Sequence, residues 1–311
     1  MSPSNPLLAT SLCGIELGSP LVNGSGTLDA QTAGTLGLAA YVTKTVTRHP
    51  REGNPPPRIA ETPSGMVNSI GLANPGLDVF LDRHLPRLAG LGVPLIVSVG
   101  GWSHGEYASA VERLSASPSV AAIELNVSCP NVDSGCISIG ADAEETRALV
   151  ELCRTATELP LLVKLSPSVA DVAAIAEAAE AGGASGLAMI NTVRGMAIDR
   201  HTLQPLLGGG GGGLSGPAVK PVGLHAVYHC RARTTLPIVG MGGVAGAQDA
   251  IEYLAAGASV VGLGTALFRD PGLPARLAGA LAEEVAARGL RSVTELVGMA
   301  LQGEAKALPK L

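Results

Sequence analysis

Short runs of apolar residues alternate along this chain with longer segments in which apolar residues recur at helical spacing. Eight runs have the length and β-branched content of buried parallel strands, at 20–24, 39–43, 94–99, 121–127, 160–165, 186–190, 236–240 and 258–263. Helices are expected at 142–158, 169–182, 217–232 and 246–256, with two more near 272–287 and 292–302. This alternation predicts an α/β protein built as a (β/α)8 TIM barrel, with a doubly wound open sheet as the main alternative. Residues 1–311 are expected to form a single domain.

Two connections are longer than ordinary strand–helix loops. Residues 44–75, after the second strand, contain six prolines and are expected to pass over one face of the barrel. Residues 192–216, after the sixth strand, include six consecutive glycines at 208–213 and lack the GxxxxGK[ST] pattern of a phosphate loop. They are expected to form a mobile loop over the site.

Composition narrows the choice of ligand. Hydrophobic residues make up 46% of the chain and aromatic residues only 2%, so aliphatic side chains must fill the core. A formal charge of -5 and the absence of a dense basic cluster argue against binding to nucleic acid. The ligand is therefore expected to be a small molecule.

The cysteines indicate neither a disulfide framework nor a metal site. There are five, an odd number, and no two form a CxxC pair.

The first thirty residues lack a secretory signal, and no apolar run approaches the length of a membrane span. We therefore expect a protein of the reducing cytoplasm with no membrane association and no bound metal.

Polar residues or glycines follow almost every predicted strand. In chain order they are Ser25 and Gly26, Lys44 and Thr45, Ser98, Asn126, Lys164, Asn191 and Thr192, Gly242 and Gly243, and Gly264 and Thr265. In a barrel these positions meet at the carboxyl-terminal face, where active sites of this fold are built. The pattern therefore predicts one shared site.

The chemistry of these residues favours a phosphate-bearing cofactor. Lys44 and Lys164 project from separate strands, which favours an anion, although either alone is more often a solvated surface lysine. Glycines after strands seven and eight allow backbone N–H groups to approach a phosphate, with a helix beginning near Gly246; ordinary turn glycines are the alternative. FMN fits better than a dinucleotide, because no GxGxxG opens a strand–helix unit.

Residues 124–131 (ELNVSCPN) place a cysteine between two asparagines at the end of the fourth strand. Asparagine amides hold planar polar ligands through paired hydrogen bonds, and a thiol exchanges a proton near neutral pH when its surroundings shift its pKa. The alternative is a buried cysteine that acts only as a small hydrophobe. The setting favours a proton-transferring role for Cys129.

Several motifs resemble those of class 1 dihydroorotate dehydrogenases, most closely the catalytic subunit of the NAD-dependent class 1B. They are residues 43–47 (TKTVT), 51–76 (REGNPPPRIAETPSGMVNSIGLANPG), 126–131 (NVSCPN), 190–199 (INTVRGMAID), 213–221 (GLSGPAVKP) and 240–243 (GMGG). The order of these matches along nearly the whole chain makes the resemblance more specific than any single motif.

The resemblance implies a role for each matching position. FMN would contact Ser25, Lys44, Thr45, Asn126, Lys164, Ile190, Gly216, Gly242, Gly243, Gly264 and Thr265. Dihydroorotate would contact Lys44, Asn68, Ser69, Ile70, Gly71, Leu72, Asn126, Asn131, Asn191 and Thr192. Cys129 would be the catalytic base on the face of the substrate opposite the flavin. Separately, Gly135 and Gly140 and the need to exclude water during hydride transfer predict that residues 130–140 form a lid.

The same resemblance implies oxidation of dihydroorotate to orotate in de novo pyrimidine (UMP) biosynthesis. Electrons would pass to NAD through a partner subunit that carries FAD and an iron–sulfur cluster, in a heterotetramer of two catalytic and two electron-transfer subunits. The alternatives are a class 1A enzyme that reduces fumarate, a non-catalytic barrel that binds flavin or pyrimidine, and a flavin barrel that reduces a base in RNA. The acidic balance disfavours the last.

Three positions depart from the family pattern. Ser98 stands where an asparagine usually reaches the flavin, Trp102 stands where a small residue is common, and residues 208–213 are unusually rich in glycine. These departures affect the expected flavin contacts and loop order, and they leave the base, the lysines and the phosphate loops in place.

Overall fold

The computed structural model describes residues 5–29, 37–128 and 139–302 of the chain. Its central sheet has eight parallel strands in the order β3-β14-β13-β10-β9-β8-β7-β4. These are β3 (Leu21–Asn23), β4 (Tyr41–Val42), β7 (Leu95–Val99), β8 (Ala122–Asn126), β9 (Leu161–Lys164), β10 (Gly186–Met189), β13 (Ile238–Met241) and β14 (Val260–Leu263). Each lies within or next to a run that the sequence predicts to be a strand.

The first and last strands of this sheet meet and close it into a barrel. The N–H of Ala39 donates to the carbonyl of Leu21 at 2.8 Å. The side chain of Asn23 then bonds both backbone groups of Val42, with its amide donating to the carbonyl and its oxygen accepting from the N–H, each at 2.8 Å. The prediction of a (β/α)8 barrel is therefore confirmed.

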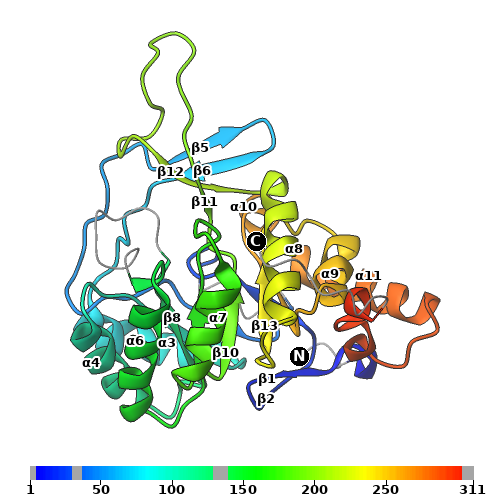
Figure 1. The fold of residues 1–311 in the computed structure, drawn as a ribbon. Coiled ribbons are helices and arrows are strands. Elements are labelled where there is room, and N and C mark those ends of the chain that lie inside the picture. The colour runs from blue at the N-terminus through cyan, green and yellow to red at the C-terminus, as the bar shows by residue number, and fades with distance from the viewer. Residues whose placement is uncertain (1–4, 30–36, 129–138, 303–311) are drawn as a thin grey trace.

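Aliphatic side chains fill the inside of the barrel, as the low aromatic content requires. Alternate strand residues point inward. The inward cluster includes Val22, Val42, Ile96, Ala122, Leu162, Ala188, Val239 and Val260. The hairpin of β1 (Thr10–Leu12) and β2 (Ile15–Leu17) adds Leu12 and Leu17 to this cluster. It covers the end of the barrel away from the site (Figure 1).

Helices surround the barrel and bury their apolar faces against the outward side chains of the strands. They are α4 (His104–Ser115), α6 (Ala143–Thr155), α7 (Val172–Ala181), α8 (Lys220–Arg231), α9 (Ala247–Ala255), α10 (Ala266–Arg269) and α11 (Leu273–Ala287). A run of short helical segments, α2 (Leu77–Val79), η2 (Phe80–His84), α3 (Leu85–Leu88) and η3 (Ala89–Leu91), lies between β4 and β7. None of the helices in the described ranges is long and apolar enough to cross a membrane.

The helix expected near 292–302 is wrong in detail. Two separate turns of 3-10 helix occupy this stretch, η5 (Val293–Leu296) and η6 (Met299–Leu301). Gly298 lies between them with a φ of 77°, a left-handed conformation that interrupts a right-handed helix.

The two long connections pair with each other in a second sheet. This antiparallel sheet has the order β11-β12-β6-β5, with β5 (Ile59–Thr62), β6 (Gly65–Asn68), β11 (Val193–Gly195) and β12 (Gly212–Ser215). Figure 1 shows it at the end of the barrel opposite the β1–β2 hairpin, with the connection between β11 and β12 projecting beyond it. The proline-rich excursion is therefore a structured cover over the barrel mouth.

The glycine-rich segment is a loop only in part. Gly212 and Gly213 belong to β12, where Gly213 pairs with Asn68 of β6 and Gly212 pairs with Gly195 of β11. A Cβ on Gly212 would lie 2.2 Å from the carbonyl oxygen of Asn68, so a larger residue would push the two strands apart. The expectation of a mobile loop throughout 192–216 is wrong for the strand residues, where glycine permits close strand packing.

Candidate active site

A cavity of about 940 Å³ opens at the carboxyl ends of the barrel strands. All eleven positions expected to contact FMN line it: Ser25, Lys44, Thr45, Asn126, Lys164, Ile190, Gly216, Gly242, Gly243, Gly264 and Thr265. Ten of them end or closely follow seven of the eight barrel strands. The other, Gly216, follows β12. The structure therefore brings together the residues expected to contact FMN, whereas Ser98, predicted from its strand end to share the site, does not line the cavity.

The positions expected to contact dihydroorotate divide into three groups. Lys44, Asn68, Ile70, Gly71, Leu72, Asn126, Asn191 and Thr192 line the same cavity. Ser69 does not, because its hydroxyl accepts from the amide of Asn54 at 2.8 Å and its N–H donates to the carbonyl of Arg58 at 2.8 Å. Cys129 and Asn131, with residues 130–138 of the expected lid, lie outside the described residues.

Thr45 joins three strand ends by hydrogen bonds. Its hydroxyl accepts from the side-chain amide of Asn126 at 3.0 Å. The same oxygen lies 2.9 Å from the Ser98 hydroxyl and 3.3 Å from the Ser25 hydroxyl. Ser98 is fully buried and does not line the cavity, so it acts on the site through Thr45.

Asn191 fixes the end of β8 at the residue before Cys129. Its side-chain amide donates to the hydroxyl of Ser128 at 3.0 Å and to the carbonyl of Ser128 at 3.1 Å. Its side-chain oxygen accepts from the N–H of Thr192 at 2.8 Å. The ends of β8 and β10 are therefore tied together where the chain enters the segment that carries the cysteine.

The segment of residues 68–72 reaches the cavity through an unusual backbone conformation. Gly71 and Leu72 both have positive φ, 69° and 57° respectively. For leucine this conformation is rare and costs free energy unless the surroundings hold it. The side-chain amide of Asn74 donates to the Leu72 carbonyl at 2.8 Å and to the Thr47 hydroxyl at 2.8 Å, and its oxygen accepts from the Gly76 N–H at 2.9 Å. Asn74 therefore holds this segment in its shape.

Replacing Asn74 with alanine is expected to raise the KM for the substrate that this segment contacts about tenfold, the equivalent of about one hydrogen bond, with a smaller change in kcat. The free energy of unfolding should fall by roughly 1–3 kcal/mol, because several partners lose a hydrogen bond. Steady-state kinetics and thermal unfolding measure the two effects. Asn5→Ala, which removes an exposed cap outside the cavity, is the matched control. A KM unchanged in Asn74→Ala would contradict this role.

Backbone glycines form the part of the cavity wall suited to a phosphate. Gly242 and Gly243 have φ values of 126° and 72°. A Cβ on Gly243 would lie 2.9 Å from the carbonyl oxygen of Gly216 and 2.9 Å from the backbone nitrogen of Lys220. A Cβ on Gly264 would meet only Thr27 within 4 Å, at 3.9 Å. Main chain without side chains therefore faces the cavity, which suits contact between N–H groups and an anion.

The lysine at the start of α8 is already engaged by acidic side chains. The ammonium of Lys220 lies 2.7 Å from Asp249 and 2.9 Å from Glu252, and these bonds raise the pKa of Lys220. Lys44 and Lys164 line the cavity itself. The glycine main chain and these two lysines together form a donor set that fits FMN.

Comparisons with known proteins identify the family of this chain. Residues 7–285 match the family model described as dihydroorotate dehydrogenase. The chain belongs to the dihydroorotate dehydrogenase family. The relative named "Dihydroorotate dehydrogenase B (NAD(+)), catalytic subunit" from Desulforudis audaxviator is 46% identical over 297 residues, covering 94% of this chain and 97% of that protein. The protein of the same name from Trichlorobacter lovleyi is 41% identical over 303 residues, covering 96% and 99%.

A solved structure shares the fold. The structure of DHODH in complex with ferulenol from Eimeria tenella superposes with a TM-score of 0.82 at 22% sequence identity, covering 97% of this chain and 90% of that one. The sequence motifs predicted a dihydroorotate dehydrogenase, most similar to the NAD-linked B type. The matches to the named relatives over nearly the whole chain confirm this prediction.

The cavity of this dihydroorotate dehydrogenase family member extends beyond the residues that sequence reasoning named. Additional lining residues come from the β5–β6 hairpin and from the segment after β14: Ile59, Glu61, Thr62, Pro63, Ser64, Gly65, Met66, Ala266, Phe268, Arg269, Asp270 and Leu273. None of the hairpin residues follows a barrel strand directly. Only the pairing of β6 with β12 brings the hairpin over the mouth, and no local signal reveals that pairing.

Proposed function

We propose that the protein is a cytoplasmic dihydroorotate dehydrogenase that oxidises dihydroorotate to orotate in pyrimidine biosynthesis, with FMN in the cavity of a one-domain barrel. The observation that carries this proposal is the convergence of all eleven expected FMN positions on one cavity in a member of this family. FMN, when bound, supplies the acceptor for a hydride. The remaining chemistry belongs to the chain's own residues.

Asparagine side chains hold the pyrimidine ring. Asn126 and Asn191 line the cavity, and their side chains lie 3.4 Å apart with Asn191 donating. Each amide group offers donors and an acceptor that match the amide edges of dihydroorotate. Their bonds to Thr45 and Ser128 fix the orientation of these groups before the substrate arrives. We therefore assign substrate orientation to this pair.

A lysine and the strained segment receive the carboxylate of the substrate. Lys44 lines the cavity, together with Asn68 and residues 70–72. A lysine ammonium and backbone N–H groups form charge-assisted hydrogen bonds to a carboxylate. Cys129 then removes the proton from the substrate carbon next to the carbonyl, on the face opposite the flavin. Asn131 is a further substrate contact in this proposal.

The electron acceptor follows from the type of relative. The relatives are named as catalytic subunits of an NAD(+) enzyme, which supports a second, electron-transfer subunit. That subunit would carry FAD and an iron–sulfur cluster, and two copies of each subunit would form a heterotetramer. The cavity rim at Ile59 and Phe268, which are 46% and 53% exposed, leaves apolar surface beside the flavin site.

The test separates the half-reaction from the choice of acceptor. The purified protein is mixed anaerobically with dihydroorotate, flavin absorbance is followed, and fumarate, NAD and an artificial dye are then offered in turn. We expect dihydroorotate to bleach the flavin, the dye to restore its colour, and NAD to restore it only after a partner subunit is added. Yellow protein that dihydroorotate does not bleach would overturn the enzyme assignment in favour of a non-catalytic barrel. Reoxidation by fumarate would indicate the A type.

A further inference from the structure

A buried carboxylate lies inside the barrel just below the cavity. Glu124 is on β8, between the inward residues Ala122 and Asn126, and is only 2% exposed. It does not line the cavity, whereas Asn126, one inward position farther along the strand, does. Within the described residues, its Oε1 atom has no hydrogen-bond partner. A carboxylate without a compensating partner in such a place carries a large desolvation cost.

Lys164 is the charge that compensates Glu124. Its Nζ atom lies 3.9 Å from Oε1 of Glu124, and the two side chains are 7% and 3% exposed. Lys164 ends the neighbouring strand β9, where it pairs in register with Asn126. The distance is too long for a hydrogen bond, so the attraction is between charges. It acts with little screening, because both groups are buried.

We propose that Glu124 is a positioning and counter-charge residue for Lys164, and that it limits the positive charge that Lys164 presents to the flavin. This inference rests on the proposed function, because it requires FMN in the cavity. A flavin gains negative charge on reduction, and a lysine ammonium in the cavity wall stabilises that form. The Glu124 carboxylate behind the ammonium opposes this stabilisation. The pair therefore keeps the reduced flavin able to release electrons to an acceptor.

Packing alone does not explain a carboxylate at this position. Glu124 lies opposite Leu162 of β9, and apolar side chains form the interior cluster below it. Replacing buried ion pairs with well-packed apolar residues often leaves a protein equally stable or more stable. An aliphatic residue would therefore meet the structural need, whereas only an acidic residue places a negative charge behind Lys164.

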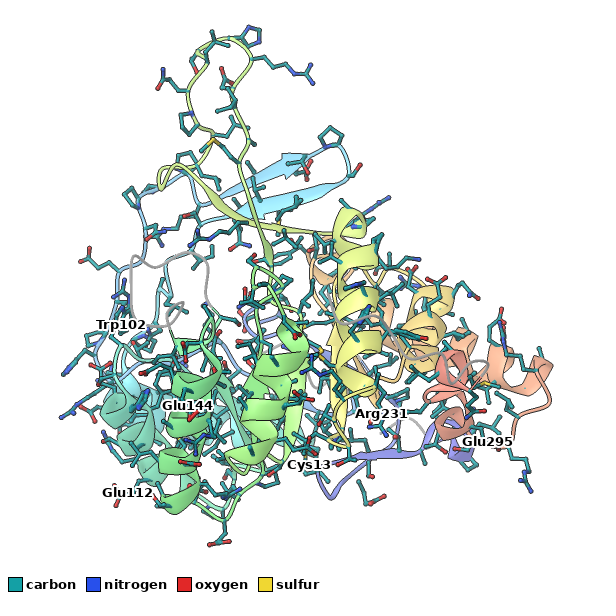
Figure 2. All side chains as sticks on the ribbon, viewed as in Figure 1. Cys13, Trp102, Glu112, Glu144, Arg231 and Glu295 are labelled. Carbon is teal, nitrogen blue, oxygen red and sulfur yellow. The ribbon has the colours of Figure 1, made fainter. Side chains whose placement is uncertain are left out.

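The reduction potential of bound FMN tests this role without relying on turnover. We compare the wild-type protein with Glu124→Gln, Lys164→Met and the double variant, each by reductive titration against a dye of known potential. Glu124→Gln is expected to shift the potential to a more positive value, and Lys164→Met to a more negative one. In the Lys164→Met background, Glu124→Gln should cause a much smaller shift. Glu112→Gln, on the exposed face of α4 (Figure 2), should leave the potential unchanged.

Two results would overturn the inference: an unchanged or more negative potential in Glu124→Gln, or an equal shift with and without Lys164. If the glutamine variant does not fold, Glu124→Asp withdraws the carboxylate from Lys164 by one methylene. It should then give a smaller positive shift, and no shift in that variant would also overturn the inference. Wild-type protein that binds no FMN would instead refute the proposed function, so the two failures are distinguishable.

Discussion

Replacing Cys129 with serine is expected to slow the reduction of bound FMN by dihydroorotate about 10²–10⁴-fold at neutral pH. This is the usual contribution of a general base to the rate, about 10²–10⁴-fold. FMN should remain bound, because the positions assigned to it do not include this residue. A thiol with a pKa near 8.5 provides about a few per cent of thiolate at neutral pH, whereas a serine hydroxyl provides almost no alkoxide. Anaerobic stopped-flow measurement of flavin bleaching between about pH 6 and pH 10 gives the rates.

The described residues that precede Cys129 in the chain are held by hydrogen bonds. Ser128, directly before it, is held by Asn191, and Asn126 is held by Thr45. The hydroxyl of Tyr107 donates to the carbonyl of Asn126 at 2.8 Å, which fixes the same strand end from behind. The end of β8 and Ser128 are therefore fixed in place, and Asn126 lines the cavity. In the wild-type protein the bleaching rate should rise with pH as the thiolate fraction grows.

Cys13→Ser is the matched control for this substitution. Cys13 lies at the β1–β2 hairpin, at the opposite end of the barrel (Figure 2), and its thiol donates to the carbonyl of Ser185 at 3.2 Å. Burial raises the pKa of Cys13 to about 12, so this thiol stays protonated throughout the measured range. Its replacement should leave bleaching unchanged. If Cys129→Ser bleached at the wild-type rate at every pH, the assignment of Cys129 as the base would be wrong.

The barrel and most of its mouth are predictable from sequence because their signals are local. Each buried strand is an apolar run, and a polar residue or glycine directly after it marks the end that faces the site. Lys164 and Gly242 are far apart in sequence, yet both line the cavity, because the barrel topology brings all strand ends to one face. For such residues, the position relative to the strand end is enough to place the residue at the cavity.

Features that depend on distant pairing are not predictable in this way. The antiparallel match of Leu214 with Val67 joins two connections about 150 residues apart, a separation that leaves no periodic pattern. Ser69 is a second case, because its hydrogen bonds to Asn54 and to the carbonyl of Arg58 hold it away from the cavity, and the sequence does not reveal those partners. The distance between Glu124 and Lys164 is a third, because only packing of adjacent strands reveals it.

Alanine in place of Gly243 is expected to weaken FMN binding at least about 100-fold, the equivalent of one or two charge-assisted hydrogen bonds. The added Cβ would lie 2.9 Å from the Gly216 carbonyl oxygen and from the Lys220 nitrogen, and both are main-chain atoms that cannot rotate away. The turn after β13 must therefore move, and its N–H groups move with it. Titration of the apoprotein with FMN, followed by flavin fluorescence, measures the affinity.

Gly289→Ala separates this effect from backbone strain. Gly289 has a φ of 71°, against 72° for Gly243, and an added Cβ would meet no atom within 4 Å. Both variants therefore carry the left-handed strain of alanine, about 1–2 kcal/mol, but only Gly243→Ala adds a clash at the cavity. The two should lose comparable stability to strain, while Gly289→Ala binds FMN like the wild type. If both variants bound FMN with equal affinity, the turn after β13 would not contact the phosphate. A displaced N–H group weakens binding only if it bonds to the ligand.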